Sequence, residues 1–268
     1  MSRLAIALLG SYWTTLDGLP VTAFATDKIR ALLAYLAVES ERPQRREALA
    51  SLLWPDHTSA AARTSLRQAL YRLRCALGDR DADPPHLLIT AKDVQLDPDS
   101  DLWVDASEFE AAISVCGANH LGGRNLCPDC VARLETAVAL YRGNFLSGFS
   151  LRACPRFDWW QLNSREAYER QALQALAWLT DHYEVRGDYD LVSKHAHRKL
   201  DLEPWRESAH RRLMRAMALS GERTEALKQY ESCRSILTRE MGVEPSLQTT
   251  QLYEQIRAGA PVVSIQRP

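Results

Sequence analysis

Apolar residues recur at three- and four-residue spacing through much of the chain, which is the period of helices that bury one face. The stretch 58–78, TSAAARTSLRQALYRLRCALG, shows this pattern clearly, with its apolar positions on one stripe. The other face carries arginine, threonine, glutamine and tyrosine, and no Asp or Glu occurs between His57 and Gly78. An exposed helix normally mixes both signs of charge, so the pattern predicts a helix that faces an anionic partner. Double-stranded DNA is the candidate, because arginine and glutamine pair with guanine and adenine in the major groove.

A small sheet and two helices are expected before this stretch. Short β-prone runs at 4–10 and 12–21 are interrupted by glycine, proline and an Asp-Gly pair, as is typical of a small antiparallel sheet. Apolar spacing predicts helices over about 27–40 and 45–53. The second helix should end at the Trp-Pro pair that follows, because proline cannot donate the next backbone hydrogen bond.

A hairpin is expected after the helix 58–78. Residues 86–96 alternate around an Ala-Lys-Asp turn, and residues 102–104 add another short strand. Strands, three helices and a closing hairpin, in that order, predict a winged helix-turn-helix domain over residues 1–104.

The order of these elements and the run RTSLRQALYRLRCALG resemble the OmpR-type winged helix of SARP-like bacterial transcriptional regulators. In such proteins the corresponding helix enters the major groove, and the hairpin touches the neighbouring backbone or minor groove. The residues that the resemblance implies as readers of bases or the groove are Arg67, Gln68, Tyr71 and Arg72. The residues expected nearer the phosphates are Arg63, Thr64, Ser65 and Arg74. Outside the helix, the expected backbone contacts are Lys28, Arg30, Arg45, Arg46 and Lys92.

The predicted hairpin region is mostly acidic. From Asp79 to Glu110, Arg80 and Lys92 are the only lysine or arginine residues. Acidic groups repel phosphate, so a backbone contact is expected there only at Lys92. For each predicted lysine or arginine contact outside the helix, an ordinary solvated side chain is the alternative interpretation.

The middle of the chain contains a group of candidate metal ligands. Cys116, His120, Cys127 and Cys130 follow one another as C-x3-H-x6-C-x2-C. Four thiolate or imidazole ligands suit tetrahedral zinc, and a complete protein shell makes such a site structural rather than catalytic. We therefore predict a structural zinc ion, with Cys154 as a substitute ligand if His120 points away. The alternatives are buried thiols that pack as small apolar groups, or a redox pair at the C-x2-C.

The rest of the chain is predicted to be helical, so the fold as a whole is mainly α. The tripeptide GDY at Gly187 recurs 34 positions later as GER at Gly221, each time between two amphipathic helical stretches. Such helix pairs stack to bury their apolar faces, as in tetratricopeptide repeats. This all-α, tetratricopeptide-like repeat domain is predicted to cover residues 105–258, with 259–268 as a tail or linker.

The same region resembles the bacterial transcriptional activator domain (BTAD) that follows the winged helix in SARP-like regulators. The segments that carry the resemblance are YRGNFLSGF, LEPWRESAHRRLMRAMALSGERTEALKQYESCRSIL and GVEPS. Stacked helix pairs of this kind form a concave surface on which a protein or nucleotide partner is conceivable.

Composition narrows the class of protein. The 268 residues suffice for two domains and carry a net charge of -1, so DNA binding has to come from a local basic patch. No apolar run is long enough to span a membrane and no secretory leader is recognisable, so a cytoplasmic protein with no membrane partner is expected. The sequence lacks the phosphate-binding loops and the nucleophile elbow of common enzyme families, so no enzymatic activity is predicted.

These features predict a sequence-specific DNA-binding transcriptional regulator. By resemblance it would be an activator that binds direct repeats at promoters, with two copies in tandem as a homodimer, and that contacts RNA polymerase. The alternative is a tetratricopeptide-type protein-interaction scaffold with a degenerate winged helix, which the base-only face of the helix 58–78 opposes. The operator, the regulated genes and any effector are not specified by the sequence.

Overall fold

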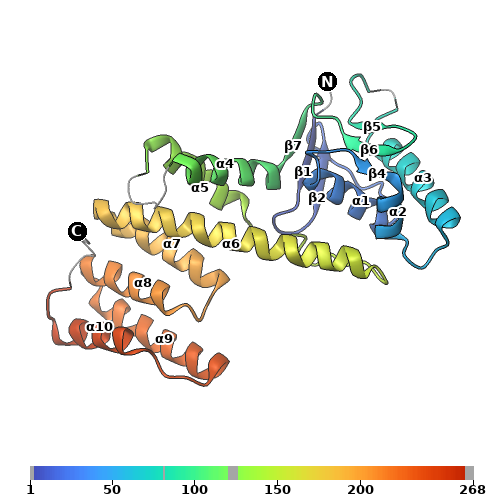
Figure 1. Ribbon diagram of the computed structural model, residues 1–268. Helices are drawn as coiled ribbons and strands as arrows, with labels where there is room; N and C mark the ends of the chain where they lie inside the picture. The colour runs from blue at the N-terminus through green and yellow to red at the C-terminus, as the bar shows by residue number, and fades with distance from the viewer. Residues whose placement is uncertain (1–2, 81, 120–125, 263–268) are drawn as a thin grey trace. The chain divides into compact units, whose positions relative to one another are not determined.

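The chain has a mixed amino-terminal part followed by a helical carboxy-terminal part (Figure 1). The computed structural model describes residues 3–80, 82–119 and 126–262. The predicted fold class, mainly α with small amino-terminal sheets, is confirmed. Among the helices of these residues, none is long and apolar enough to cross a lipid bilayer.

Packing divides the chain into two compact units. The first comprises Met1–Ala111 and Ala139–Tyr168, and the second comprises Ala112–Val138 and Glu169–Pro268. Helices α4 (Asp105–Asn119), α5 (Pro128–Leu140) and α6 (Pro155–Arg186) each contribute residues to both units. The predicted domains are continuous segments of the chain, whereas each of these compact units combines two separate segments.

A four-stranded sheet opens the first unit, with the strand order β3-β2-β1-β7. Its strands are β1 (Leu4–Ala7), β2 (Trp13–Leu16), β3 (Leu19–Pro20) and β7 (Leu102–Val104). β1 runs antiparallel to β2 and parallel to β7, so strands from both ends of the predicted winged helix lie side by side. The turn between β2 and β3 has a positive φ at both Asp17 and Gly18, as a tight two-residue hairpin requires.

Three helices and a second sheet complete the winged helix. The helices are α1 (Asp27–Val38), α2 (Arg46–Leu53) and α3 (Ser59–Ala76), close to their predicted bounds. The second sheet has the order β4-β6-β5 and consists of β4 (Gln44–Arg45), β5 (Leu87–Ile89) and β6 (Asp93–Leu96). β5 and β6 form the predicted hairpin, which we call the wing. β4 pairs with β6 and thereby ties the start of α2 to the wing.

The later segment of the first unit packs against the strands of the winged helix. A β-bridge joins Leu9 to Phe145. The buried carboxylate of Asp105 accepts hydrogen bonds from the backbone N–H groups of Leu8 at 2.7 Å and Leu9 at 3.0 Å. Arg142 Nη2 lies 2.6 Å from the same carboxylate. Residues 139–168 therefore belong to the core on which the winged helix is built.

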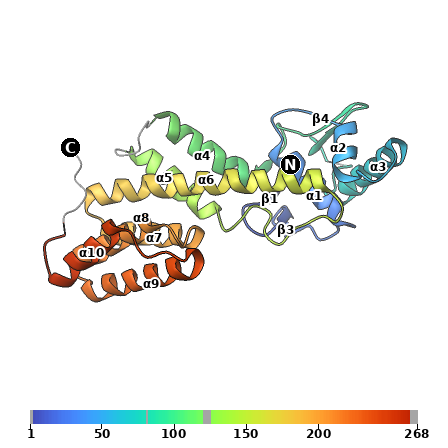
Figure 2. The same ribbon diagram turned by 60° about the horizontal axis from the view of Figure 1, so that its bottom comes forward.

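The second unit contains the predicted repeat. Its further helices are α7 (Tyr189–Leu202), α8 (Glu207–Leu219), α9 (Arg223–Met241) and α10 (Leu247–Ala258). α8, α9 and α10 lie side by side in both views (Figures 1 and 2). The turns that precede α7 and α9 contain Gly187 and Gly221 with φ of 72° and 84°, a conformation that favours glycine. The repeated glycines of the sequence therefore mark equivalent turns.

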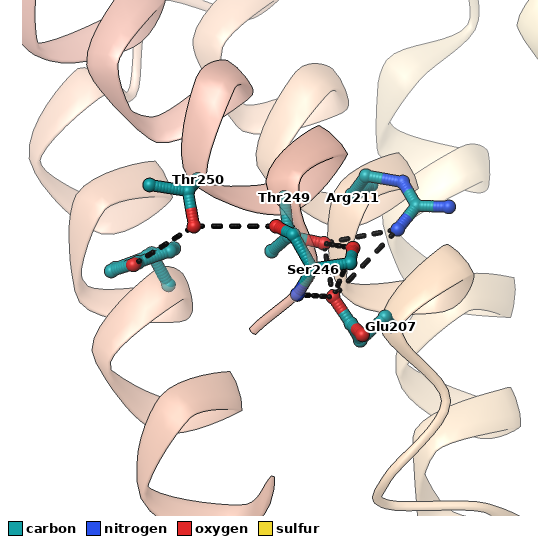
Figure 3. Close-up of polar contacts among 6 residues, drawn as sticks. Glu207, Arg211, Ser246, Thr249 and Thr250 are labelled. Atoms are coloured by element: carbon teal, nitrogen blue, oxygen red, sulfur yellow. Dashed lines mark hydrogen bonds and ion pairs between the residues drawn. The ribbon is translucent and has the colours of Figure 1, made fainter. Parts of the chain in front are cut away.

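A carboxylate from α8 holds the start of α10 (Figure 3). Glu207 Oε2 accepts hydrogen bonds from Ser246 N at 2.9 Å, Ser246 Oγ at 2.7 Å and Thr249 Oγ1 at 2.5 Å. Arg211 Nη1 donates to Thr249 Oγ1 at 2.9 Å. Ser246 is the N-cap of α10, so Glu207 supplies from a neighbouring helix the acceptor that an N3 glutamate supplies in a capping box.

Candidate nucleic-acid interface

α3 turns one apolar face to the core and one polar face to solvent. The buried residues are Ala62, Leu66, Ala69, Leu70 and Leu73. The exposed polar residues are Arg63, Thr64, Arg67, Gln68, Tyr71 and Arg72, whereas Ser65 and Arg74 are half-buried. Thr58 caps the helix, because its side chain accepts a hydrogen bond from Ala61 N at 3.4 Å. The predicted amphipathic arrangement is therefore present.

Three guanidinium groups of the exposed face have no partner within the described part of the chain. Arg63, Arg67 and Arg72 form no ion pair and no hydrogen bond with any residue that the structure describes. Arg63 and Arg67 are four residues apart, so they are neighbours on the helix surface and repel each other. An anionic partner would relieve that repulsion.

Arg74 differs from these three arginines because it is engaged within the fold. Its Nε donates to Asp79 Oδ2 at 3.2 Å, and its Nη2 donates to the backbone oxygen of Asp79 at 3.2 Å. Asp79 is fully buried and also accepts hydrogen bonds from the backbone N–H groups of His86 and Leu87. Arg74 therefore connects the end of α3 to the start of the wing, and its predicted phosphate contact remains untested.

Tyr71 is covered by an arginine from the loop after α3. The guanidinium carbon of Arg80 lies 4.8 Å from the centroid of the Tyr71 ring, and Arg80 Nη1 donates to Tyr71 Oη at 3.4 Å. This cation–π contact holds the exposed phenol in place and adds a positive charge beside it. We did not predict this arginine as part of the interface, because it lies outside the helical pattern.

A groove lies between α2, α3 and the wing, and we call it the basic groove. Its volume is about 830 Å³. Its charged and polar lining residues are Arg45, Arg46, Glu47, Arg63, Thr64, Arg67 and Lys92. The structure thus brings together predicted contacts from β4, α2, α3 and the wing, with Glu47 as the only acid among the lining residues.

The wing is fixed against the start of α2 by hydrogen bonds. Arg46 Nη1 donates to the backbone oxygen of Thr90 at 3.0 Å, and Arg46 N donates to the backbone oxygen of Lys92 at 3.0 Å. Arg45 Nη1 lies 3.4 Å from Asp93 Oδ1. These contacts use part of the donor capacity of Arg45 and Arg46, whereas Lys92 extends from the exposed turn of the wing.

The two predicted contacts on α1 lie in different surroundings. Arg30 Nη1 pairs with Asp27 Oδ1 at 2.7 Å. Lys28 Nζ lies 5.4 Å from the ring centroid of Trp54. Lys28 lines a second groove, which is shared with α3, whereas Arg30 lines neither groove. Lys28 and Arg30 look equivalent in the sequence, but in the structure only Lys28 faces a groove beside α3.

The candidate zinc ligands are described only in part. Cys116 Sγ lies 3.7 Å from the backbone oxygen of Cys130, and Cys130 N donates to Cys127 Sγ at 3.4 Å. Burial, together with these two neighbouring thiols, raises the pKa of the Cys130 thiol. Among the described residues, no group of three or more His, Cys, Asp or Glu side chains is arranged to hold a metal ion, and His120 lies outside those residues. The zinc ion therefore remains a prediction.

Cys154, the predicted substitute ligand, has a different partner. Its Sγ donates to the backbone oxygen of Leu53 at 3.4 Å within the first compact unit. The side chain is fully buried there. This thiol fastens the start of α6 to the end of α2.

Comparisons with known proteins identify the family. Residues 104–257 match the bacterial transcriptional activator domain, BTAD. The transcriptional regulatory protein EmbR of Mycobacterium tuberculosis is 27% identical over 267 residues, which cover 97% of this chain and 65% of EmbR. MoaR1 of the same organism is 27% identical over 245 residues, which cover 88% of this chain and 74% of MoaR1. The chain thus spans slightly less than two thirds of the length of EmbR.

A solved structure has the same fold over nearly the whole chain. It is that of Mycobacterium tuberculosis EmbR in complex with a low affinity phosphopeptide, with a TM-score of 0.66 and 25% sequence identity. The similarity covers 98% of this chain and 67% of that chain. These relatives are transcriptional regulators and not enzymes, which agrees with the lack of enzyme motifs in the sequence. Because the BTAD match covers more than half of the residues, the chain belongs to the family of bacterial transcriptional regulators that carry this activator domain.

Proposed function

We propose that this protein is a sequence-specific DNA-binding transcriptional regulator that reads promoter DNA with α3. The observation that carries the proposal is the set of exposed arginines Arg63, Arg67 and Arg72, which have no partner among the described residues. Their helix is anchored by a buried apolar face, so it can enter a groove as a rigid element. A duplex supplies regularly spaced phosphates and base edges that match guanidinium donors.

Some residues of the interface would contact bases and others would contact phosphates. Arg67, Gln68 and Arg72 would meet base edges, because they lie on the exposed side of the central turns of α3. Arg63 at the first turns of the helix and Lys92 at the tip of the wing would meet phosphates along the basic groove. Glu47 in that groove would keep the phosphate backbone nearer to α3 and the wing than to α2.

The mode of regulation is also part of this proposal. The protein would act as an activator at promoters with direct repeats, where two copies bind in tandem and contact RNA polymerase. Half-sites about 10 to 11 base pairs apart would place both copies of α3 on one face of the duplex. The EmbR structure holds a phosphopeptide, which supports a protein partner for this chain as well.

A structural zinc ion is proposed for the loop before α5. The support is the C-x2-C arrangement, in which Cys130 N donates to Cys127 Sγ at 3.4 Å. A backbone N–H that points at a cysteine sulfur stabilises the thiolate form that zinc requires. The proposed ligands are Cys116, His120, Cys127 and Cys130, and the ion would hold the loop and not catalyse a reaction.

Selection of binding sites from a random duplex pool tests the DNA-binding function. Wild-type protein should enrich one sequence, and Arg67→Ala and Arg72→Ala should lose the enrichment. Arg239→Ala is the matched control, because this exposed arginine lies on α9 in the second unit. Failure of the folded wild-type protein to enrich any sequence would favour the alternative of a tetratricopeptide-type scaffold with a degenerate winged helix.

A further inference from the structure

The second groove of the first unit joins the winged helix to the BTAD region. It lies between the start of α1, the middle of α3 and the segment Ser150–Arg152, and its volume is about 380 Å³. The segment Ser150–Arg152 lies within residues 104–257, the part of the chain that matches the BTAD family. One wall of a groove beside α3 is therefore supplied from outside the winged helix.

Three cations from three segments line this second groove. They are Lys28 of α1, Arg72 of α3 and Arg152. None of them forms an ion pair or a hydrogen bond with a residue of the described ranges, although Lys28 lies over the Trp54 ring. The only carboxylate among the lining residues is that of Asp27, and it pairs with Arg30 at 2.7 Å. The groove therefore has an uncompensated positive charge.

The backbone near Arg152 is held in place by its neighbours. Leu151 is buried, and Cys154 Sγ donates to the backbone oxygen of Leu53 at 3.4 Å. Arg156 Nη1 donates to Ser51 Oγ at 3.2 Å. The Arg152 side chain is exposed between these anchors. A fixed backbone with a free guanidinium loses little conformational entropy when it binds an anion.

Continuity with α3 identifies the anion. Gln68 and Arg72 are one helical turn apart and line the second groove from the same face of α3 that would enter the major groove. A phosphate beside a major-groove helix is commonly contacted by several positive side chains, which set the orientation of the protein on the duplex. We propose that Arg152, together with Lys28, holds a backbone phosphate of the DNA that α3 binds, beside the base edges that Arg72 would contact. This inference rests on the proposed function.

The contact would make the BTAD region part of the DNA-binding surface. The basic groove and the second groove are lined by different residues of α3, with Arg63 and Arg67 in the first and Gln68 and Arg72 in the second. Phosphates on both sides of the helix would then be held, one side by the wing and the other by Arg152. The DNA affinity of the whole chain would exceed that of its winged helix for this reason.

Salt-dependent DNA binding of the full chain tests the inference. Wild type, Arg152→Ala, Arg152→Lys and the control Arg239→Ala are titrated by fluorescence anisotropy with the selected duplex and with a random duplex of equal length. Arg152→Ala should weaken binding to both duplexes alike and flatten the slope of log K against log salt by about one unit. Arg152→Lys should largely restore the slope, because it keeps the charge, and Arg239→Ala should match wild type.

The outcomes separate this inference from the proposed function. If wild type prefers the selected duplex and Arg152→Ala keeps the wild-type slope, the phosphate contact is refuted while DNA reading stands. A loss confined to the selected duplex would also refute it, since that result assigns Arg152 to a base. If wild type shows no preference for any duplex, the proposed function fails. In that case, Arg152→Ala that keeps the wild-type salt slope on random DNA would also reject the phosphate contact. Equal thermal unfolding of the variants excludes misfolding as the cause of a loss.

Discussion

Arg74 Nε lies 3.2 Å from Asp79 Oδ2, and this ion pair joins the end of α3 to the start of the wing. The same carboxylate accepts hydrogen bonds from the backbone N–H groups of His86 and Leu87. One buried side chain thus connects both parts of the winged helix that would face DNA. Asp79 therefore helps to set the position of the wing relative to α3, in addition to the contacts that fix the wing against α2.

Replacement of Asp79 by alanine should destabilise the winged helix by roughly 2–4 kcal/mol. The reason is that two backbone N–H groups lose their acceptor inside the protein, and Arg74 loses its partner. Urea unfolding measures the change. Asp99→Ala is the control, because Asp99 is an exposed acid of the same region. Equal stability of the two variants would show that the connection contributes nothing.

Glu207 should make the stability of the repeat unit depend on pH. Burial raises the pKa of its carboxyl, but hydrogen bonds from Thr249 and Ser246 outweigh burial and set the pKa below the ordinary value of 4.5. A carboxyl whose pKa is lower in the folded state stabilises the fold above its unfolded pKa. That stabilisation is lost as the pH falls through the folded pKa.

Comparison of wild type with Glu207→Gln by thermal unfolding between pH 3 and pH 7 measures this effect. At neutral pH the variant should be less stable by about 1–3 kcal/mol, because charged hydrogen bonds are replaced by neutral ones. The difference should shrink as the pH falls below about 4.5, because the carboxyl of the unfolded chain then gains its proton, and it should be gone below the lower pKa of the folded state. Glu231→Gln, at an exposed position of α9, is the control. A difference between wild type and Glu207→Gln that stays constant with pH would contradict the role of the charge.

Replacing Arg67 or Arg63 by alanine should change DNA binding in different ways. If Arg67 pairs with a guanine, its loss should cost about 1–3 kcal/mol on the selected duplex and little on random DNA. If Arg63 holds a phosphate, its loss should weaken both duplexes alike and flatten the salt slope by about one unit. Anisotropy titrations on both duplexes distinguish the two roles. An equal loss on both duplexes for Arg67→Ala would rule out base reading by that residue.

Local pattern was sufficient to predict α3, because the burial of Leu66, Leu70 and Leu73 follows directly from their helical spacing. It was not sufficient for β4, which has only two residues and therefore no period to detect. β4 exists because Gln44 and Arg45 pair with β6, a strand much later in the chain. Pairing over such a distance leaves no trace in the pattern of either segment.

The limits are the same at the candidate site. Sequence identified Arg63, Arg67 and Arg72 as a face without acids, and the structure places all three on the exposed side of α3. It could not show that Arg74 is engaged by Asp79, since arginines along a helix look alike until their neighbours are known. Arg152 was missed for a related reason, because only tertiary packing brings its segment beside α3.

Metal analysis of purified protein should find about one zinc ion per chain if the predicted site exists. Cys127→Ser should lose the ion, since a hydroxyl is a poor zinc ligand, and the loop before α5 should then lose stability against heat. Cys75→Ser is the matched control, because Cys75 is exposed on α3 and belongs to no candidate site. A chelator should reproduce the effect of Cys127→Ser in wild type and change nothing in that variant. Clearly less than about one zinc per chain, in protein never exposed to a chelator, would leave the thiols as buried packing groups or as a redox pair.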